Sequence, residues 1–419
     1  MITLVACSNT AFSGGPLVIQ GAAGNTPVKY QNPAITVNVE AGDLGTTSNT
    51  DANMLLQEAL DLWNNVSTSA LNMSVDTTAI TTDIDENNFT TVLPGVNGGA
   101  QNNNDNLNPV IYDSNGAIID AFFGNGASDN TLGFAASFFS IGGDFFSEGF
   151  AVINGRDLGI TNTDFILLIT HEIGHFTGLD HSQININNQE NISGLPFICL
   201  STMASNYPVM YPFICRDSSS LHLDDEISLS SLYPAADIDN NLGILQGNLV
   251  NLAGDAILGA NVFAVKTTTG EAVSSVSDYL LQDTGFYKLY LPAGNYKLHA
   301  NSINTLFNGG SSIGPYADTI LSESFTTPHP ITETIYQDAV TNDDAIITIV
   351  SNQTVAFNFV LDVTVNEVDN TNNTDTGGSG GGSNKILGAP SFITLLLLLG
   401  LLATTRRLFF CSAKQARLL

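Results

Sequence analysis

Basic residues are scarce in this chain of 419 residues, which has 11 Lys and Arg against 40 Asp and Glu and a formal net charge of −29. Several of the few basic residues gather near the C-terminus: Lys385, Arg406, Arg407, Lys414 and Arg417. A surface this acidic repels DNA, RNA and anionic membranes, so we expect no nucleic-acid partner. The composition suits a secreted protein kept soluble by its charge. Acidic clusters such as DIDNN at 237–241 are either solvated surface or structural Ca2+ sites.

Cysteine is also scarce, with four residues in the whole chain. Cys7 and Cys411 lie in terminal segments that resemble targeting sequences. Cys199 and Cys215 are the remaining pair, and both lie inside one predicted domain. In an oxidising compartment we expect this pair to form a disulfide.

A basic region is missing from the N-terminus as well, although MITLVACSNTAFSGGPL begins with apolar residues. The pattern is that of a signal-peptide remnant, so we assign 1–27 to a leader and N-terminal segment. The chain is too long for one ordinary core, and we expect two globular domains.

The first domain is predicted at 28–236 and belongs to the α+β class. Apolar runs predict strands at 34–45, within PVIYD and AIIDAFF, and at 131–140 and 149–155. Helical periodicity predicts helices at 49–66, 163–178 and 223–234. Thr163 or Asp164 is expected to cap the second helix, and Gly178 to end it.

The pattern changes beyond Pro234. Alternating β-rich runs with turn signals predict an all-β sandwich at 243–365. A Gly/Ser/Asn-rich linker follows at 366–385. Residues 386–405 carry no charge and are long enough for a transmembrane helix, with a basic cytoplasmic tail at 406–419.

Histidine is rare too, but three of the six residues fall within LLITHEIGHFTGLDHSQ at 167–183. His171 and His175 project from one face of a helix, and Gly178 permits a turn that brings His181 back towards them. Three neutral imidazoles leave a fourth tetrahedral position, the arrangement of a catalytic Zn2+ site, where Glu172 is placed to act as general base. The alternative is a buried helix whose histidines are ordinary core or surface residues.

The longer motif HEIGHFTGLDHS resembles the metzincin zinc peptidases, and among them the matrixin-like branch. The resemblance covers roughly 34–236 and implies a metzincin-like domain with a twisted mixed sheet plus three helices. It also implies a downstream turn whose Met supports the ligands; Met203 and Met210 are candidates, and YPVMYPF favours Met210. Ordinary core packing is the alternative role for either Met.

Two further segments resemble that family. LDDEISLSSLYP is similar to its last helix, with Asp224 and Asp225 in the first turn, where acidic residues suit the helix dipole. TLGFAASFF is similar to its edge strand, which implies that the backbone at Ala135 and Ala136 binds an extended peptide.

The chain also departs from the family. Ile214 stands where matrixins have a tyrosine, so the pocket that it lines with Pro212 is expected to be altered. An enlarged insert that carries Cys199 precedes Met210, and no cysteine-switch propeptide is visible. The histidines of a second, structural zinc are missing, and His222 is read as a surface residue at a helix start.

The other two segments carry resemblances of their own. Residues 243–365 resemble carboxypeptidase-regulatory-like sandwiches, either as a spacer or as a binding module, with His299 and His329 read as incidental surface residues. The C-terminus resembles a GlyGly (rhombosortase-type) sorting tail, which implies a Gram-negative-type bacterium, export machinery and a rhomboid-type sorting protease. A permanent anchor is the alternative.

Taken together, these features predict an exported monomer that hydrolyses peptide bonds of extracellular proteins. A non-catalytic cell-surface adhesion protein with a peptidase-like domain is the alternative from another class. An enzyme that acts on a non-protein amide or ester also fits the motif.

Overall fold

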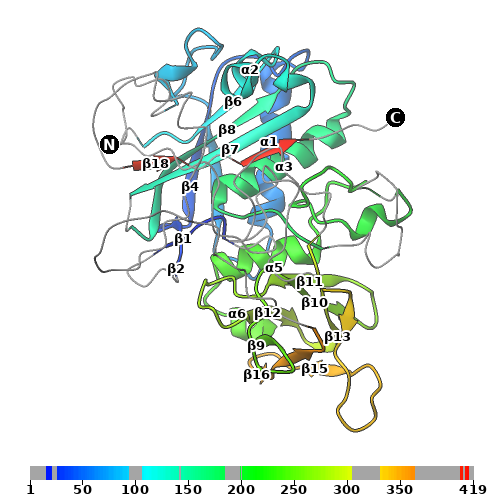
Figure 1. The fold of residues 1–419 in the computed structure, drawn as a ribbon. Helices are drawn as coiled ribbons and strands as arrows, with labels where there is room; N and C mark the ends of the chain where they lie inside the picture. The colour runs from blue at the N-terminus through cyan, green and yellow to red at the C-terminus, as the bar shows by residue number, and fades with distance from the viewer. Residues whose placement is uncertain are drawn as a thin grey trace, which may run out of the picture.

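The computed structural model describes residues 16–20, 26–93, 106–140, 143–184, 199, 201–303, 331–363, 406–408 and 411–414. Figure 1 shows an α+β region, in blue to green, above a β-rich region in green to orange. The first region contains the histidine motif, and the second begins at β9 (Leu242–Asn251).

A mixed sheet forms the centre of the first region, in the order β18-β7-β8-β6-β4-β5, with β3 also paired to β8 and β19 to β7. Strands β4, β5, β6 and β8 are parallel, whereas β7 runs antiparallel to β8. The bounds are β3 (Lys29–Tyr30), β4 (Ala34–Val39), β5 (Asn72–Asp76), β6 (Pro109–Asp113), β7 (Thr131–Ser140), β8 (Phe145–Asn154), β18 (Arg406–Leu408) and β19 (Cys411–Lys414). A separate pair, β1 (Ile19–Gln20) and β2 (Thr26–Pro27), lies beside this sheet in Figure 1.

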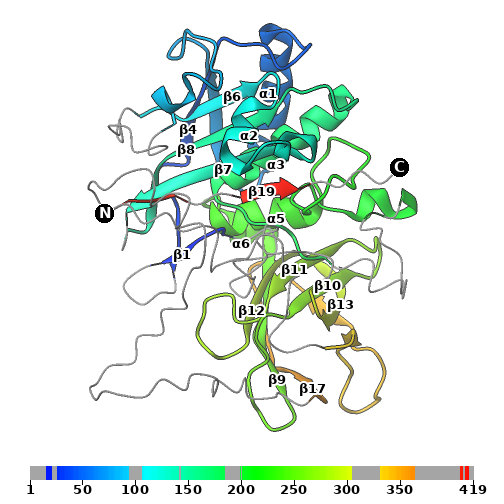
Figure 2. The same cartoon turned by 45° about the horizontal axis from the view of Figure 1, so that its top comes forward.

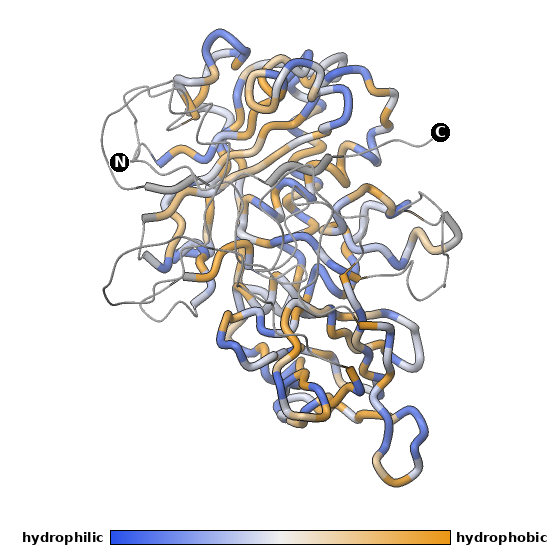
Figure 3. The backbone as a smooth tube through the Cα atoms, in the orientation of Figure 1, coloured by the Kyte–Doolittle hydropathy of each residue, from blue (hydrophilic) through white to orange (hydrophobic). Residues whose placement is uncertain are grey.

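Both faces of the sheet are covered. Helices α1 (Asn49–Asn64) and α3 (Asn162–Thr177) pack on one face, and α2 (Ala117–Phe123) packs on the other. Successive residues of β7 therefore alternate between two apolar clusters, Ala135 in the first and Phe134 in the second. The tube in Figure 3 shows the resulting apolar stretches through the central strands.

Two sheets that enclose one apolar core form the second region. One sheet contains β9, β12 (Phe286–Pro292), β16 (Thr354–Ala356) and β17 (Phe359–Leu361). The other contains β10 (Asn261–Lys266), β11 (Ala272–Val276), β13 (Gly294–Asn301), β14 (Thr334–Ile335) and β15 (Ile347–Ile349). Helices α5 (Leu223–Leu232) and α6 (Ile238–Asn241) lie between the two regions, as Figure 2 shows.

One predicted strand is wrong. The run AIIDAFF forms the helix α2, which was not among the three helices expected for the first domain. Its start is fixed by Gly116 in the left-handed conformation and by the Asp113 carboxylate, which accepts the Ile119 N–H at 2.8 Å. An apolar run this short satisfies a strand and one face of a helix equally well, so its pattern did not decide between them.

The predicted fold class is also wrong in its last element. It included a transmembrane helix at 386–405, yet no helix within the described parts of the chain is both long and apolar enough to cross a membrane. Residues 386–405 themselves lie outside those parts, and the segments that follow, β18 and β19, are strands paired with β7. What stands of the fold class is α+β.

Candidate metal centre

Helix α3 presents the histidine motif, and local signals define both of its ends. Thr161 caps the start in a capping box: its hydroxyl accepts the Asp164 N–H at 3.2 Å, and the Asp164 carboxylate accepts the Thr161 N–H at 2.7 Å. The cap is thus Thr161 rather than the predicted Thr163 or Asp164, although Asp164 is its partner. Gly178 ends the helix with φ 99°, a conformation that residues with a side chain rarely adopt.

Three histidines converge behind this turn. The Nε2 atoms of His171, His175 and His181 lie 3.1 to 3.2 Å from one another, and all three side chains are buried. His171 Nδ1 lies 2.7 Å from the Val209 carbonyl oxygen, and His175 Nδ1 lies 2.8 Å from that of Leu179. Because these carbonyls can only accept, each Nδ1 carries the proton and each Nε2 keeps a lone pair. The three histidines therefore form a group that can hold a metal ion.

The electrostatics of the group favour the ligand form of these histidines. Burial lowers the pKa of His171 to about 4, partly opposed by its bond to the Val209 carbonyl. Burial, together with the neighbouring His171, lowers the pKa of His175 well below its ordinary value. Both imidazoles are therefore neutral at pH 7, which is the state that binds a metal without first releasing a proton.

Glu172 lies beside the group with an uncompensated carboxyl. The side chain is wholly buried, and neither oxygen has a hydrogen-bond partner in the described structure. It packs against Gly133 of β7, where an added Cβ would lie 3.0 Å from Glu172 Oε1. Burial raises the pKa of this carboxyl well above its ordinary value. A buried acid without partners is rare and marks a place where a further polar group is needed.

Met210 lies against α3 at Gly174. It is wholly buried, and an added Cβ on Gly174 would lie within 3.0 Å of its Cε, so the glycine admits the thioether. Met203, the other candidate, is only half-buried and packs at the edge of the apolar cluster between the two regions. The structure thus places Met210, and not Met203, next to the helix that bears His171 and His175.

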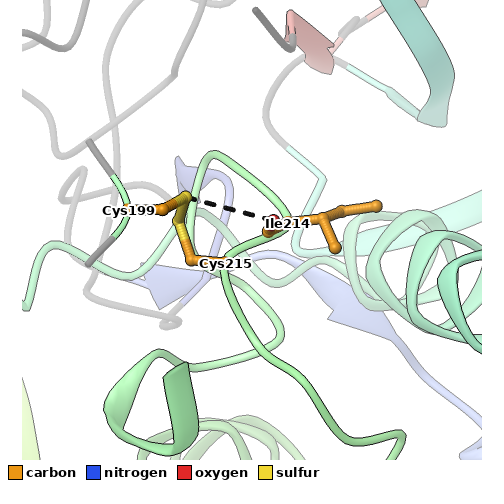
Figure 4. Close-up of a disulfide and its surroundings, with 3 residues drawn as sticks. All are labelled: Cys199, Ile214 and Cys215. Atoms are coloured by element: carbon orange, nitrogen blue, oxygen red, sulfur yellow. Dashed lines mark hydrogen bonds between the residues drawn. A yellow bond between two sulfur atoms is a disulfide. The ribbon is translucent and has the colours of Figure 1, made fainter. Parts of the chain in front are cut away.

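The predicted substrate residues lie on two segments, β7 and the chain after Met210. Ala135 and Ala136 are buried in β7, and the outer edge of this strand pairs with β19, with Cys411 opposite Ala135. Pro212 is buried and Ile214 half-buried on the chain after Met210. A disulfide joins Cys199 to Cys215 with a Cα–Cα distance of 5.2 Å, and the Cys199 sulfur lies 4.0 Å from the Ile214 carbonyl oxygen (Figure 4). The disulfide therefore restrains the segment that carries Ile214.

The sequence missed a set of buried polar groups beneath this centre. Both oxygens of Asp225 accept backbone N–H groups, from Val209 at 2.8 Å and from Met210 at 2.9 Å. His222, predicted to lie at the surface, is buried, and its Nδ1 caps α5 by accepting the Asp224 N–H at 3.1 Å. Asp224 and Asp225 at the start of the helix could be recognised in the sequence. The favourable interaction of acidic residues with the helix dipole, however, does not show which groups they bond to.

His299 and the DIDNN segment can also be placed. His299 is also buried rather than at the surface; it stacks on Phe263, and its Nδ1 lies 3.0 Å from Glu333 Oε1. His329 lies outside the described residues. The DIDNN segment forms α6, and within the described ranges no group of acidic side chains there converges as a metal site would.

Comparisons with known proteins add little. No protein-family model matches the sequence, and no curated protein matches it. A solved structure, the crystal structure of BcpA, the major pilin subunit of Bacillus cereus, aligns over 29% of this chain and 29% of its own, with 16% sequence identity and a TM-score of 0.17. A TM-score this low lies below the range of proteins that share a fold.

Proposed function

We propose that this chain is a Zn2+-dependent endopeptidase. The observation that carries the proposal is the convergence of three buried imidazole Nε2 atoms beside a buried carboxyl that has no hydrogen-bond partner among the described residues. Tetrahedral nitrogen ligands about 2.0–2.1 Å from one Zn2+ are roughly 3.3–3.4 Å apart, close to the separations here. A set of three histidines leaves one position open, as in catalytic rather than structural zinc sites. A zinc ion held there supplies Lewis-acid activation of water and of a carbonyl group at neutral pH.

Glu172 is the residue that moves protons in this proposal. Its oxygens have no hydrogen bonds to other described residues, and burial raises its pKa, which strengthens it as a proton acceptor. The carboxylate accepts a proton from the attacking water and later donates it to the leaving amine. The carbonyls of Val209 and Leu179 hold the imidazoles of His171 and His175 in place, and Met210 packs against α3 at Gly174.

A peptide substrate is favoured by the edge of β7. Glu172 touches Gly133, and this residue pairs with Ala413 of β19 in an antiparallel register. An extended segment on this edge therefore passes directly beside Glu172, as a substrate added to the sheet would. The disulfide between Cys199 and Cys215 supports an exported protein, because such bonds persist in oxidising compartments.

The test is a digest of a proteome-derived peptide mixture by the Zn2+-loaded protein, with new termini read by mass spectrometry. Glu172→Ala is the matched variant, and we expect it to keep zinc while its turnover falls by about 10²–10⁴-fold. Cuts made only by the parent support an endopeptidase, and the residue after each cut reports the pocket near Ile214. A folded, zinc-loaded parent that makes no cuts would instead favour the non-catalytic binding protein.

A further inference from the structure

Asp224 connects the metal centre to the β-sandwich through buried hydrogen bonds. Its side chain is wholly buried in the first turn of α5. One oxygen accepts the Ser182 hydroxyl at 2.7 Å. The other accepts both the N–H of Ser274, at 2.8 Å, and its hydroxyl, at 3.2 Å. Each carboxylate oxygen therefore serves a different region of the molecule.

Ser182 places this connection next to a metal ligand. It directly follows His181, and its own N–H donates to the Met210 carbonyl at 2.7 Å. The short segment that presents His181 is thus held from two sides, by the chain at Met210 and by Asp224. Because the third imidazole comes from a turn and not from α3, its position depends on such bonds more than those of His171 and His175 do.

Ser274 lies on β11, a strand with one edge that is not paired with another strand in the described structure. Within the described structure β11 pairs only with β10, where Ser274 stands opposite Phe263. The N–H of Ser274 is therefore available to a carboxylate on α5. Apolar packing fixes the same junction, with Ile184 and Tyr211 from the first region and Phe263 and Ile303 from the second in one buried cluster.

We infer that the β-sandwich is part of the metal centre, with Ser274 acting through Asp224 and Ser182 as a positioning residue for His181. This inference rests on the metal-binding part of the proposed function and not on peptide hydrolysis. A tether that acted only to join the two regions would need no bond from the same carboxylate to the residue beside a ligand. Outer partners of metal ligands typically change metal affinity by about 10–100-fold.

The test reads the metal rather than activity. The zinc dissociation constant of the full chain is measured by competition with a chromophoric chelator, and the visible spectrum is recorded with Co2+ in place of zinc. We expect Asp224→Ala and Ser182→Ala to weaken zinc binding by about 10–100-fold and to shift the Co2+ bands, and Ser274→Ala to do so less, because it keeps its N–H. Asp224→Asn restores binding, since its amide can accept from Ser274 and donate to the Ser182 oxygen.

Ser275→Ala is the matched control, because Ser275 is the next residue of β11 and its buried hydroxyl has no partner among the described residues. It should leave both readouts unchanged. Parent-like affinity and spectra in Asp224→Ala, or in Ser182→Ala and Ser274→Ala if the first does not fold, would overturn the inference. A parent that binds no metal would overturn it together with the proposed function. A parent that binds metal without cleaving peptides would overturn the peptidase alone.

Discussion

Acidic side chains are completely buried at two places in the molecule, and the two places differ in the hydrogen bonds that these side chains make. At the metal centre, Glu172 has no hydrogen-bond partner for either oxygen among the described residues. At the start of α5, Asp225 accepts three backbone N–H groups, those of Val209, Met210 and His222. Both carboxyls have a raised pKa because of burial, but only the second is compensated by bonds.

The buried histidines show the same difference in hydrogen bonding. His222 uses its Nδ1 lone pair to cap α5, whereas the Nε2 lone pairs of His171 and His175 face one another. Since leaving a buried polar group without a partner costs about 1–3 kcal/mol, a fold retains such a group only where something else is gained. The difference teaches that Asp225 and His222 stabilise the fold through their bonds, whereas Glu172 carries a buried carboxyl whose cost no bond among the described residues offsets.

Asp225→Ala should remove the bonds that compensate the buried acid of α5, and we expect it to have the largest effect on stability. It leaves three buried N–H groups without an acceptor, so we expect the free energy of unfolding to fall by about 3 kcal/mol or more. Urea unfolding measures the change. Glu226→Ala, at the next and exposed position of the same helix, is the control and should shift the midpoint little. Equal effects of the two variants would contradict the structural role of Asp225.

The buried His222, which caps α5, makes the stability of the fold depend on pH. Burial and the nearby Arg216 lower its pKa to about 3, against about 6.5 in the unfolded chain. The unfolded chain therefore binds a proton that the folded one excludes between these values, so stability is fully present above pH 6.5 and is lost as pH falls towards 3. For this one group we expect a loss of about 2 kcal/mol between pH 7 and pH 5.

His222→Asn isolates that contribution, because Asn also caps helices but does not titrate. Urea unfolding of parent and variant at pH 7 and pH 5, both with a chelator, cancels the effect of the other histidines. The variant should lose less stability than the parent over this interval. Parallel losses would show that His222 takes up a proton within the folded protein.

The contrast also separates what the sequence can predict from what it cannot. His171, His175 and Gly178 are related by helical periodicity and one turn, so a local pattern was enough to bring His181 to them. The bonds of Asp225 and the burial of His222 depend on segments that meet only in the folded chain, and no local pattern reports them. The prediction for the seven residues of α2 was wrong for another reason: their apolar pattern fits both a strand and a helix.

Glu172→Gln tests whether the uncompensated carboxyl of Glu172 lowers the stability of the folded protein. The pKa of Glu172 is raised on folding, so its contribution opposes folding once the pH exceeds its unfolded value near 4.3, and this penalty grows as the pH rises. We expect the metal-free variant to be more stable than the parent at pH 7, with the gain vanishing below pH 4, where the carboxyl is protonated in the folded and the unfolded chain. Thermal unfolding in chelator measures it. A variant less stable than the parent at both pH values would show that the carboxylate has a stabilising partner.

The smallest expected effect concerns the edge of β7, where β19 lies on the strand that Glu172 touches. Residues 411–414 pair with this edge antiparallel, so a peptide substrate must displace them before it can pair there (Figure 2). Deleting 406–419 should therefore raise kcat/KM for a peptide substrate by a factor of about ten or less, mainly through KM, because the lost bonds resemble those that a substrate makes. Ser412→Pro in the full chain, which removes one N–H from β19, should give part of the gain. Initial rates over a range of substrate concentrations separate KM from kcat, and an unchanged KM in both variants would mean that substrate reaches Glu172 by a path that avoids this edge.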